Sequence, residues 1–150
     1  MEATQKNTLV LGLGNLLLGD EGVGVHAARA LQDECCEDVE IQDVGTAILD
    51  ALPALERADR VIVMDAMKGH GDPGTIYRTP MDQCTGNSCI ASLHGFDLRS
   101  VLTLAGCETS PEVLVLGVEP AVVEWSMALS PPVKNALPVL LEAVREELSQ

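Results

Sequence analysis

Three side chains that could bind a divalent metal ion, Glu21, Asp65 and His94, each lie where a strand-like run stops, far apart in the sequence. In an open α/β sheet, ligands bind in the crevice outside the carboxyl ends of the strands, where residues remote in sequence converge. Two carboxylates and one imidazole, with room for a water or a substrate atom, are a suitable ligand set for such an ion. The spacing therefore predicts a divalent-metal site at one edge of a sheet.

Each acidic residue also has a plain structural interpretation. Asp20 and Glu21 stand in the run Gly19–Gly24, immediately before a predicted helix, where Asp20 could be the N-cap and the helix dipole would favour Glu21. Asp65 ends an apolar strand and could cap the turn that follows. Capping leaves the surrounding glycines unexplained, so both interpretations stay open.

The histidines offer few choices, since the chain has three. His94 stands just before a predicted helix and could simply cap it. His26 falls on the polar side of the first predicted helix, which indicates the surface. His70 lies in a glycine-rich loop close to Asp65 and is the main competitor for a ligand role.

Apolar periodicity predicts the elements that must position these residues. Continuous or alternating apolar runs are typical of strands, and apolar residues spaced by three and four are typical of helices. Pro53 is expected to disturb the second helix. The pattern predicts strands over 8–14, 39–44, 60–65, 75–78 and 112–118, and helices over 22–34, 48–55, 98–105 and 133–148.

This alternation demands a mainly parallel sheet with right-handed crossovers. We expect an α/β fold: a single doubly wound domain over residues 1–150, with a twisted sheet of about five strands and helices on both faces. The short strand at 75–78 is expected at an edge.

Composition excludes several function classes. The 150 residues hold 9 Lys and Arg against 23 Asp and Glu, a formal charge of −14, which disfavours binding to nucleic acid or anionic lipid. No apolar run reaches the ~20 residues needed to cross a bilayer. The five cysteines are an odd number, and of them Cys84 and Cys89 alone could form a disulfide or a zinc half-site. We expect reduced thiols and a cytoplasmic protein.

Other chemistries find weaker support. Gly12-Leu13-Gly14 after a strand invites a nucleotide-binding interpretation, with Asp43 as the acidic residue ending the second strand, but Leu17 stands where the fingerprint needs a third glycine. No P-loop and no Gly-x-Ser-x-Gly elbow is present. A hydrolase would therefore fit attack by a metal-assisted water better than an acyl-enzyme.

Five segments together resemble one protein family. In order they are LGLGNLLLGDEGVG at 11–24, DVGT at 43–46, VMDA at 63–66 with PG at 73–74, SLH at 92–94, and LGVEP at 116–120. They are similar to the signatures of the nickel–iron hydrogenase maturation proteases, and they span nearly the whole chain.

The resemblance implies an endopeptidase that trims a C-terminal extension from a hydrogenase large-subunit precursor after nickel insertion. Glu21, Asp65 and His94 match that family's metal-contacting residues, and Asp43 matches an acidic position linked to substrate recognition. Glu119, at the end of the last strand, is our own candidate for a residue that supports the metal-contacting ones.

Nickel would then arrive with the precursor, without any organic cofactor, and we expect the protein to act as a monomer. The metal could act as a Lewis acid on a bound water, or Glu21 or Asp65 could be the general base. A nucleotide-binding module and a nickel-checking chaperone without hydrolysis remain the alternatives. Lys68, His70 and the Cys84–Cys89 insert depart from the family pattern and leave the choice of substrate open.

Overall fold

A five-stranded sheet forms the centre of the computed structural model, which describes residues 7–34, 37–81, 101, 103–104 and 111–150. The strands are β1 (Thr8–Leu13), β2 (Val39–Gly45), β3 (Arg60–Ala66), β4 (Ile76–Pro80) and β5 (Glu112–Val118). Their order is β2-β1-β3-β5-β4, parallel except for β4, which pairs antiparallel with β5 at one edge. The α/β class, the strand count and the edge position of residues 75–78 are thus confirmed.

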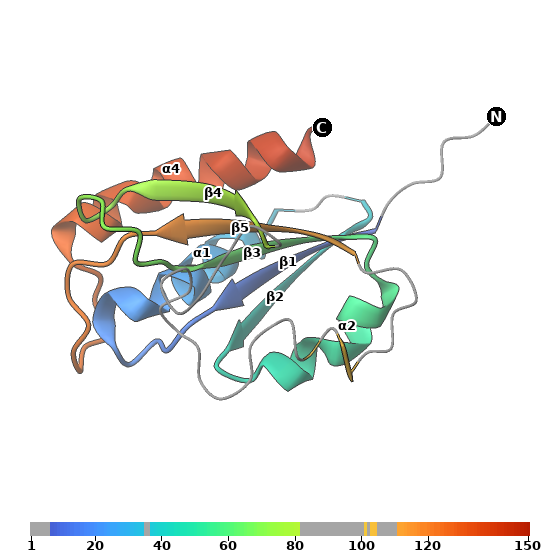
Figure 1. Ribbon diagram of the computed structural model, residues 1–150, viewed down its shortest axis with the longest axis horizontal. Helices are drawn as coiled ribbons and strands as arrows, with labels where there is room; N and C mark the ends of the chain where they lie inside the picture. The colour runs from blue at the N-terminus through green and yellow to red at the C-terminus, as the bar shows by residue number, and fades with distance from the viewer. Residues whose placement is uncertain (1–6, 35–36, 82–100, 102, 105–110) are drawn as a thin grey trace.

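Helices cover both faces of this sheet (Figure 1). A 3₁₀ turn, η1 (Gly19–Gly22), leads into α1 (Val23–Leu31), which lies with α4 (Pro131–Leu148) against one face. The turn η2 (Ile48–Ala51) and α2 (Leu52–Arg57) pack on the other. Alternate strand residues supply the two cores, with Val10 and Ile62 facing α1 and α4 and Leu9 and Val61 facing α2. No helix in the described ranges is long and apolar enough to span a bilayer.

Several element boundaries, and the effect of Pro53, differ from the sequence prediction. The first helix ends at Leu31, not at residue 34. Pro53 does not disturb the second helix; it stands in the first turn of α2, where its missing N–H has no intrahelical partner to lose. The helix predicted at 98–105 falls largely outside the described residues.

Close backbone contact joins α1 to the sheet. A Cβ on Gly24 would lie 2.1 Å from the carbonyl oxygen of Met64 and 2.4 Å from that of Leu13. A Cβ on Gly12 would lie 2.3 Å from the carbonyl oxygen of Gly24. The first turn of α1 can therefore reach β1 and β3 only through glycine.

A buried ion-pair cluster fixes the far end of α4. Glu147 is largely buried and pairs with Arg60 of β3 and, at 2.8 Å, with Arg78 of β4. Arg60 also donates a hydrogen bond of 2.8 Å to the Glu147 carbonyl oxygen. One carboxylate thus ties the helix to β3 and β4, away from the carboxyl end of β3 where the site is predicted.

We expect Gly24→Ala to lower the free energy of unfolding by about 2 kcal/mol or more, although alanine gains about 1 kcal/mol in helix propensity. The reason is the overlap with two carbonyl oxygens, neither of which belongs to a flexible side chain. Urea denaturation followed by circular dichroism measures the change.

The matched control is Ala30→Gly on the exposed side of the same helix. It should cost about 1 kcal/mol, the propensity term alone. A Gly24→Ala protein more stable than the wild type would contradict the close approach.

Candidate functional site

The strand order places a switch point between β1 and β3. From the carboxyl end of β1 the chain passes through α1 to β2 on one side, and from the carboxyl end of β3 it continues to β4 and β5 on the other side. The two connections therefore diverge at the carboxyl ends of the neighbouring strands β1 and β3. Ligands of open α/β sheets bind in the crevice at such a point. The turn that carries Glu21 follows β1, and Asp65 belongs to β3.

Gly14 is where these two segments meet. Its φ of +129° favours glycine. A Cβ there would lie 2.0 Å from the backbone carbonyl oxygen of Glu21 and 3.5 Å from Oδ1 of Asp65. The η1 turn and the Asp65 carboxylate therefore approach one point from two sides.

Both acids are removed from water. Glu21 is 4% exposed and Asp65 is fully buried. Oδ1 of Asp65 accepts a hydrogen bond of 2.8 Å from the backbone N–H of Ala66. A buried carboxylate needs donors or a cation, and carboxylate oxygens are ligands that hard divalent cations accept.

Of the three predicted ligands, the structure places the backbone of Glu21 and the carboxylate of Asp65 on either side of Gly14. His94 lies outside the described residues, as do Cys84 and Cys89. Within the described ranges, no group of three His, Cys, Asp or Glu side chains is close enough to hold a metal ion. The three-residue site therefore stays a prediction.

Asp20 is not a helix N-cap. Neither η1 nor α1 has a side-chain cap, and the fully buried Asp20 carboxylate instead holds the segment between β5 and α4. It accepts hydrogen bonds from the N–H groups of Ala121 and Val122, both 2.8 Å, and from the N–H and Oγ of Ser130, both 2.7 Å. The capping interpretation failed because these donors lie about a hundred positions away in sequence.

These hydrogen bonds also set the protonation of Asp20. Burial alone would raise the pKa of the carboxyl, but the bonds from Ser130, Val122 and Ala121 outweigh it and lower the pKa below its usual 3.8. Asp20 is therefore a charged structural tie directly before Glu21.

Glu119 performs a similar task for the loop after Asp65. Its Oε1 accepts hydrogen bonds from the N–H groups of Gly69 and Gly71, at 2.9 and 3.0 Å, and from the Tyr77 hydroxyl at 2.8 Å. Burial, followed by this bond to Glu119, raises the pKa of Tyr77. Glu119 thus shapes the loop at 68–74, and its support of the predicted metal-contacting residues stays a prediction.

Asp43 lies at the carboxyl end of β2, opposite Gly12 of β1. Its Oδ2 pairs with Nε of Arg29 at 2.8 Å, while both side chains keep some solvent exposure. This partner was not predicted from the sequence, although Arg29 could have been found as a cation on the polar side of the helix that follows β1.

The other two histidines differ from each other. His26, expected at the surface, is half-buried; its Nε2 is enclosed without a hydrogen-bond partner among the described residues. Burial, then the charge of Arg29, lowers the pKa of His26, against a hydrogen bond to the Met127 backbone that raises it. The prediction was wrong because the segment after β5 covers this side of α1. His70 is exposed, with a φ of +66°.

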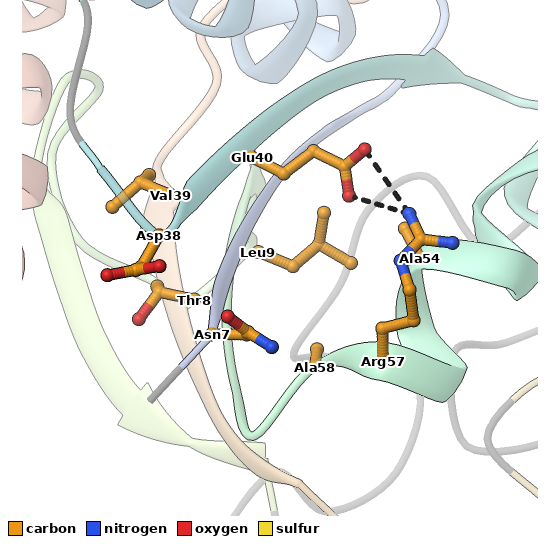
Figure 2. Close-up of a pocket in the computed structure, with 9 residues that line it drawn as sticks. All are labelled: Asn7, Thr8, Leu9, Asp38, Val39, Glu40, Ala54, Arg57 and Ala58. Carbon is orange, nitrogen blue, oxygen red and sulfur yellow. Dashed lines mark hydrogen bonds and ion pairs between the residues drawn. The ribbon is translucent and has the colours of Figure 1, made fainter. Parts of the chain in front are cut away.

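A separate cavity of about 370 Å³ opens at the opposite end of the sheet (Figure 2). It is bounded by the amino ends of β1 and β2 and by α2, and an ion pair of 3.3 Å between Arg57 and Glu40 crosses its rim. It contains none of the predicted site residues; its lining is Asn7, Thr8, Leu9, Asp38, Val39, Glu40, Ala54, Arg57 and Ala58.

Fold and site together define an open, doubly wound α/β protein with two buried acids, Glu21 and Asp65, at its switch point. A family model described as hydrogenase maturation protease matches residues 25–147. The hydrogenase expression/formation protein HupD of Rhizobium leguminosarum bv. viciae is 38% identical over 146 residues, which is 91% of this chain and 72% of the relative. The hydrogenase 2 maturation protease of Escherichia coli K12 is 32% identical over 149 residues, covering 95% and 90%.

A solved structure agrees with these relatives. The hydrogenase maturating endopeptidase HybD from Escherichia coli matches with a TM-score of 0.84 at 31% identity, over 95% of this chain and 92% of that one. This chain therefore belongs to the hydrogenase maturation protease family, as the sequence motifs predicted.

We expect Asp20→Asn to lower the free energy of unfolding by about 2 kcal/mol at neutral pH, because an amide offers N–H groups to donors that need an acceptor. Since the folded-state pKa lies below 3.8, the ionised carboxylate stabilises the fold above that pH, and this contribution is lost as pH falls through the lowered value. Urea denaturation across a pH series measures both effects.

The exposed Asp33→Asn change removes the same charge and serves as the control. The difference in free energy of unfolding between Asp20→Asn and wild type should shrink in acid. At neutral pH it should exceed the difference between Asp33→Asn and wild type. Equal stability of the two variants at neutral pH would show that Asp20 is no structural tie.

Proposed function

We propose that this protein is an endopeptidase that removes a C-terminal extension from the precursor of a nickel–iron hydrogenase large subunit after nickel insertion. Family membership supports the peptidase class and the processing of a hydrogenase precursor. The observation that argues most directly for this site is the approach of the η1 turn and the Asp65 carboxylate at Gly14, on the switch point of the sheet.

In this proposal Glu21, Asp65 and His94 contact the nickel ion that the precursor carries. Carboxylate oxygen and imidazole nitrogen are acceptable ligands for a divalent first-row metal, and the set is small enough to leave positions for precursor atoms. Sharing the ion would dock the scissile bond only when the metal is already in place. Nickel is thus part of the substrate.

Cleavage then requires a water to attack the scissile carbonyl carbon, the C–N bond to break and a proton to reach the leaving amine. A nickel-bound water would ionise more readily than free water. Alternatively Glu21 or Asp65 takes the proton from water while the metal positions the bond. Both routes use the same three side chains.

Glu119 has a positioning role in this scheme. Its three hydrogen bonds fix the loop that follows Asp65, so the end of β3 is held from the side of β5 and β4. The buried carboxylate of Asp65 thereby gains a rigid setting, which a site of this kind requires.

We expect Glu21→Gln, Asp65→Asn and His94→Ala each to reduce cleavage of nickel-loaded precursor by a factor of about 10² or more, because each removes a metal contact or a proton acceptor. Mass spectrometry of the precursor shows whether the extension has been lost. Nickel-free precursor should stay uncut by the wild type.

The matched control is His70→Gly, which removes the competing imidazole and suits the positive φ of that position. It should cleave at the wild-type rate. Loss of cleavage in His70→Gly together with full cleavage by His94→Ala would transfer the ligand role to His70. Binding of the precursor without a change in its mass would favour the non-hydrolytic chaperone. Saturable binding of NAD or ATP, measured by calorimetry, would favour the nucleotide-binding module.

We further propose that Asp43 contacts a basic group of the precursor, which competes with Arg29 for the carboxylate. Asp43→Asn should then raise KM for the precursor by about tenfold, in the range of one exposed charge-assisted contact. Steady-state cleavage kinetics provide the measurement.

Arg29→Gln breaks the same ion pair but leaves the carboxylate free for substrate, so its KM should stay level or fall. If the pair serves the fold alone, the two variants should behave alike. Equal increases in KM for both would therefore remove Asp43 from substrate recognition.

A further inference from the structure

Apolar side chains gather in solvent on the segment that joins β5 to α4. Trp125 is 80% exposed and Met127 is 60% exposed. Val122 and Val123 on the same segment, and Leu17 beside it, are exposed as well. We call these five side chains the apolar ridge. Large apolar groups scattered singly on a surface are ordinary, but a cluster marks an interaction site.

The ridge is held rigidly, so its exposure is a property of the folded chain. The N–H of Gly19 donates to the Ser126 carbonyl at 2.7 Å, and the N–H of Ser126 donates to the Leu17 carbonyl at 2.9 Å. The N–H of Asp20 also donates to the Val122 carbonyl at 3.0 Å. Figure 1 shows the segment after β5 running beside the turn before α1.

Side chains also hold this segment in place. The buried Asp20 carboxylate binds the start and the end of the segment, at Ala121, Val122 and Ser130. His26 of α1 lies next to the Met127 backbone. A preorganised surface loses little conformational entropy when a partner binds, which is how rigid aromatic anchors yield affinity.

The place of the ridge in the fold points to its partner. Asp20, which holds the segment, is followed directly by Glu21 in the same turn. A protein whose chain end enters the crevice at Glu21 and Asp65 would therefore present its folded body to the ridge. Glu124 lies exposed within the ridge and the whole chain carries a formal charge of −14, so the complementary surface is apolar with basic groups around it.

We propose that the apolar ridge docks the folded body of the hydrogenase precursor, through an apolar surface with a basic rim, while the extension occupies the crevice. This rests on the proposed function for the identity of the partner. Trp125 is the central anchor, since large aromatic side chains dominate the binding energy of most interfaces. The ridge then sets KM for the precursor and leaves the chemical step to the crevice.

Trp125 is the single tryptophan of the chain, which makes it a direct probe. In protein labelled with 5-fluorotryptophan, one ¹⁹F resonance reports on this ring. Adding unlabelled precursor should shift the resonance and abolish its solvent isotope shift between H₂O and D₂O, because the ring leaves water. A resonance that keeps its full isotope shift in the presence of saturating precursor overturns the proposal.

Kinetics supply the second test. The double variant Trp125→Ala/Met127→Ala should raise KM for the precursor by about tenfold or more, with kcat retained. Val139→Ala, which truncates an apolar side chain 57% exposed on α4, is the control and should leave KM unchanged. Urea denaturation of both variants checks that they fold. An unchanged KM in the folded double variant overturns the proposal.

Self-association is the competing use of such a ridge. Sedimentation equilibrium that finds a wild-type dimer, dissociated in the double variant while KM is unaffected, overturns docking of the precursor. The ¹⁹F measurement also separates the ridge proposal from the proposed function. If wild type leaves nickel-loaded precursor uncut, the proposed function fails, and the ¹⁹F isotope shift still decides whether the precursor covers the ridge.

Discussion

The arrangement of this molecule depends on the close approach of backbone to backbone where α1 meets the sheet. The helix begins so near to β1 and β3 that a single methyl group on Gly24 would overlap two carbonyl oxygens. Gly14 makes the same approach possible between the η1 turn and Asp65. Because a helix that packs this tightly cannot slide, the turn before it has one position, and the backbone of Glu21 is delivered to the Asp65 carboxylate. The glycines around the acids are therefore a geometric requirement of the site, which the capping interpretation left unexplained.

Two consecutive acids have different tasks in this arrangement. The Asp20 carboxylate accepts four hydrogen bonds from the segment after β5. Glu21 stays at the switch point. A single 3₁₀ turn thus fixes both the crevice and the apolar ridge, so the distance between the two is set by the backbone of adjacent residues. If the extension enters the crevice while the precursor body rests on the ridge, that fixed distance limits which precursors fit.

Local signals predicted much of this fold, and non-local contacts explain what they missed. Continuous apolar runs such as 60–65 identified the buried strands because both faces of a parallel sheet are covered. Asp65 stood out because a carboxylate ending such a run must find a partner. The insertion of β5 between β3 and β4 carries no comparable signal, since strand pairing is settled by contacts far apart in sequence. The donors of Asp20 and the cover over His26 lie on the segment between β5 and α4 for the same reason, and neither could be inferred from neighbouring residues.

Charge gives the proposed gating a physical basis. Glu21 and Asp65 are both out of water in a chain with a formal charge of −14, and burying a carboxylate costs electrostatic free energy. A divalent cation lowers that free energy most where water is excluded, because the interaction of opposite charges strengthens as the effective dielectric constant falls. Under the proposed function, a precursor that brings the cation would therefore be bound more tightly than one that lacks it, and the difference in affinity would grow as the precursor excludes water from the two acids. Docking on the ridge would increase this discrimination, since the same contact that raises affinity for the precursor also removes solvent from the metal.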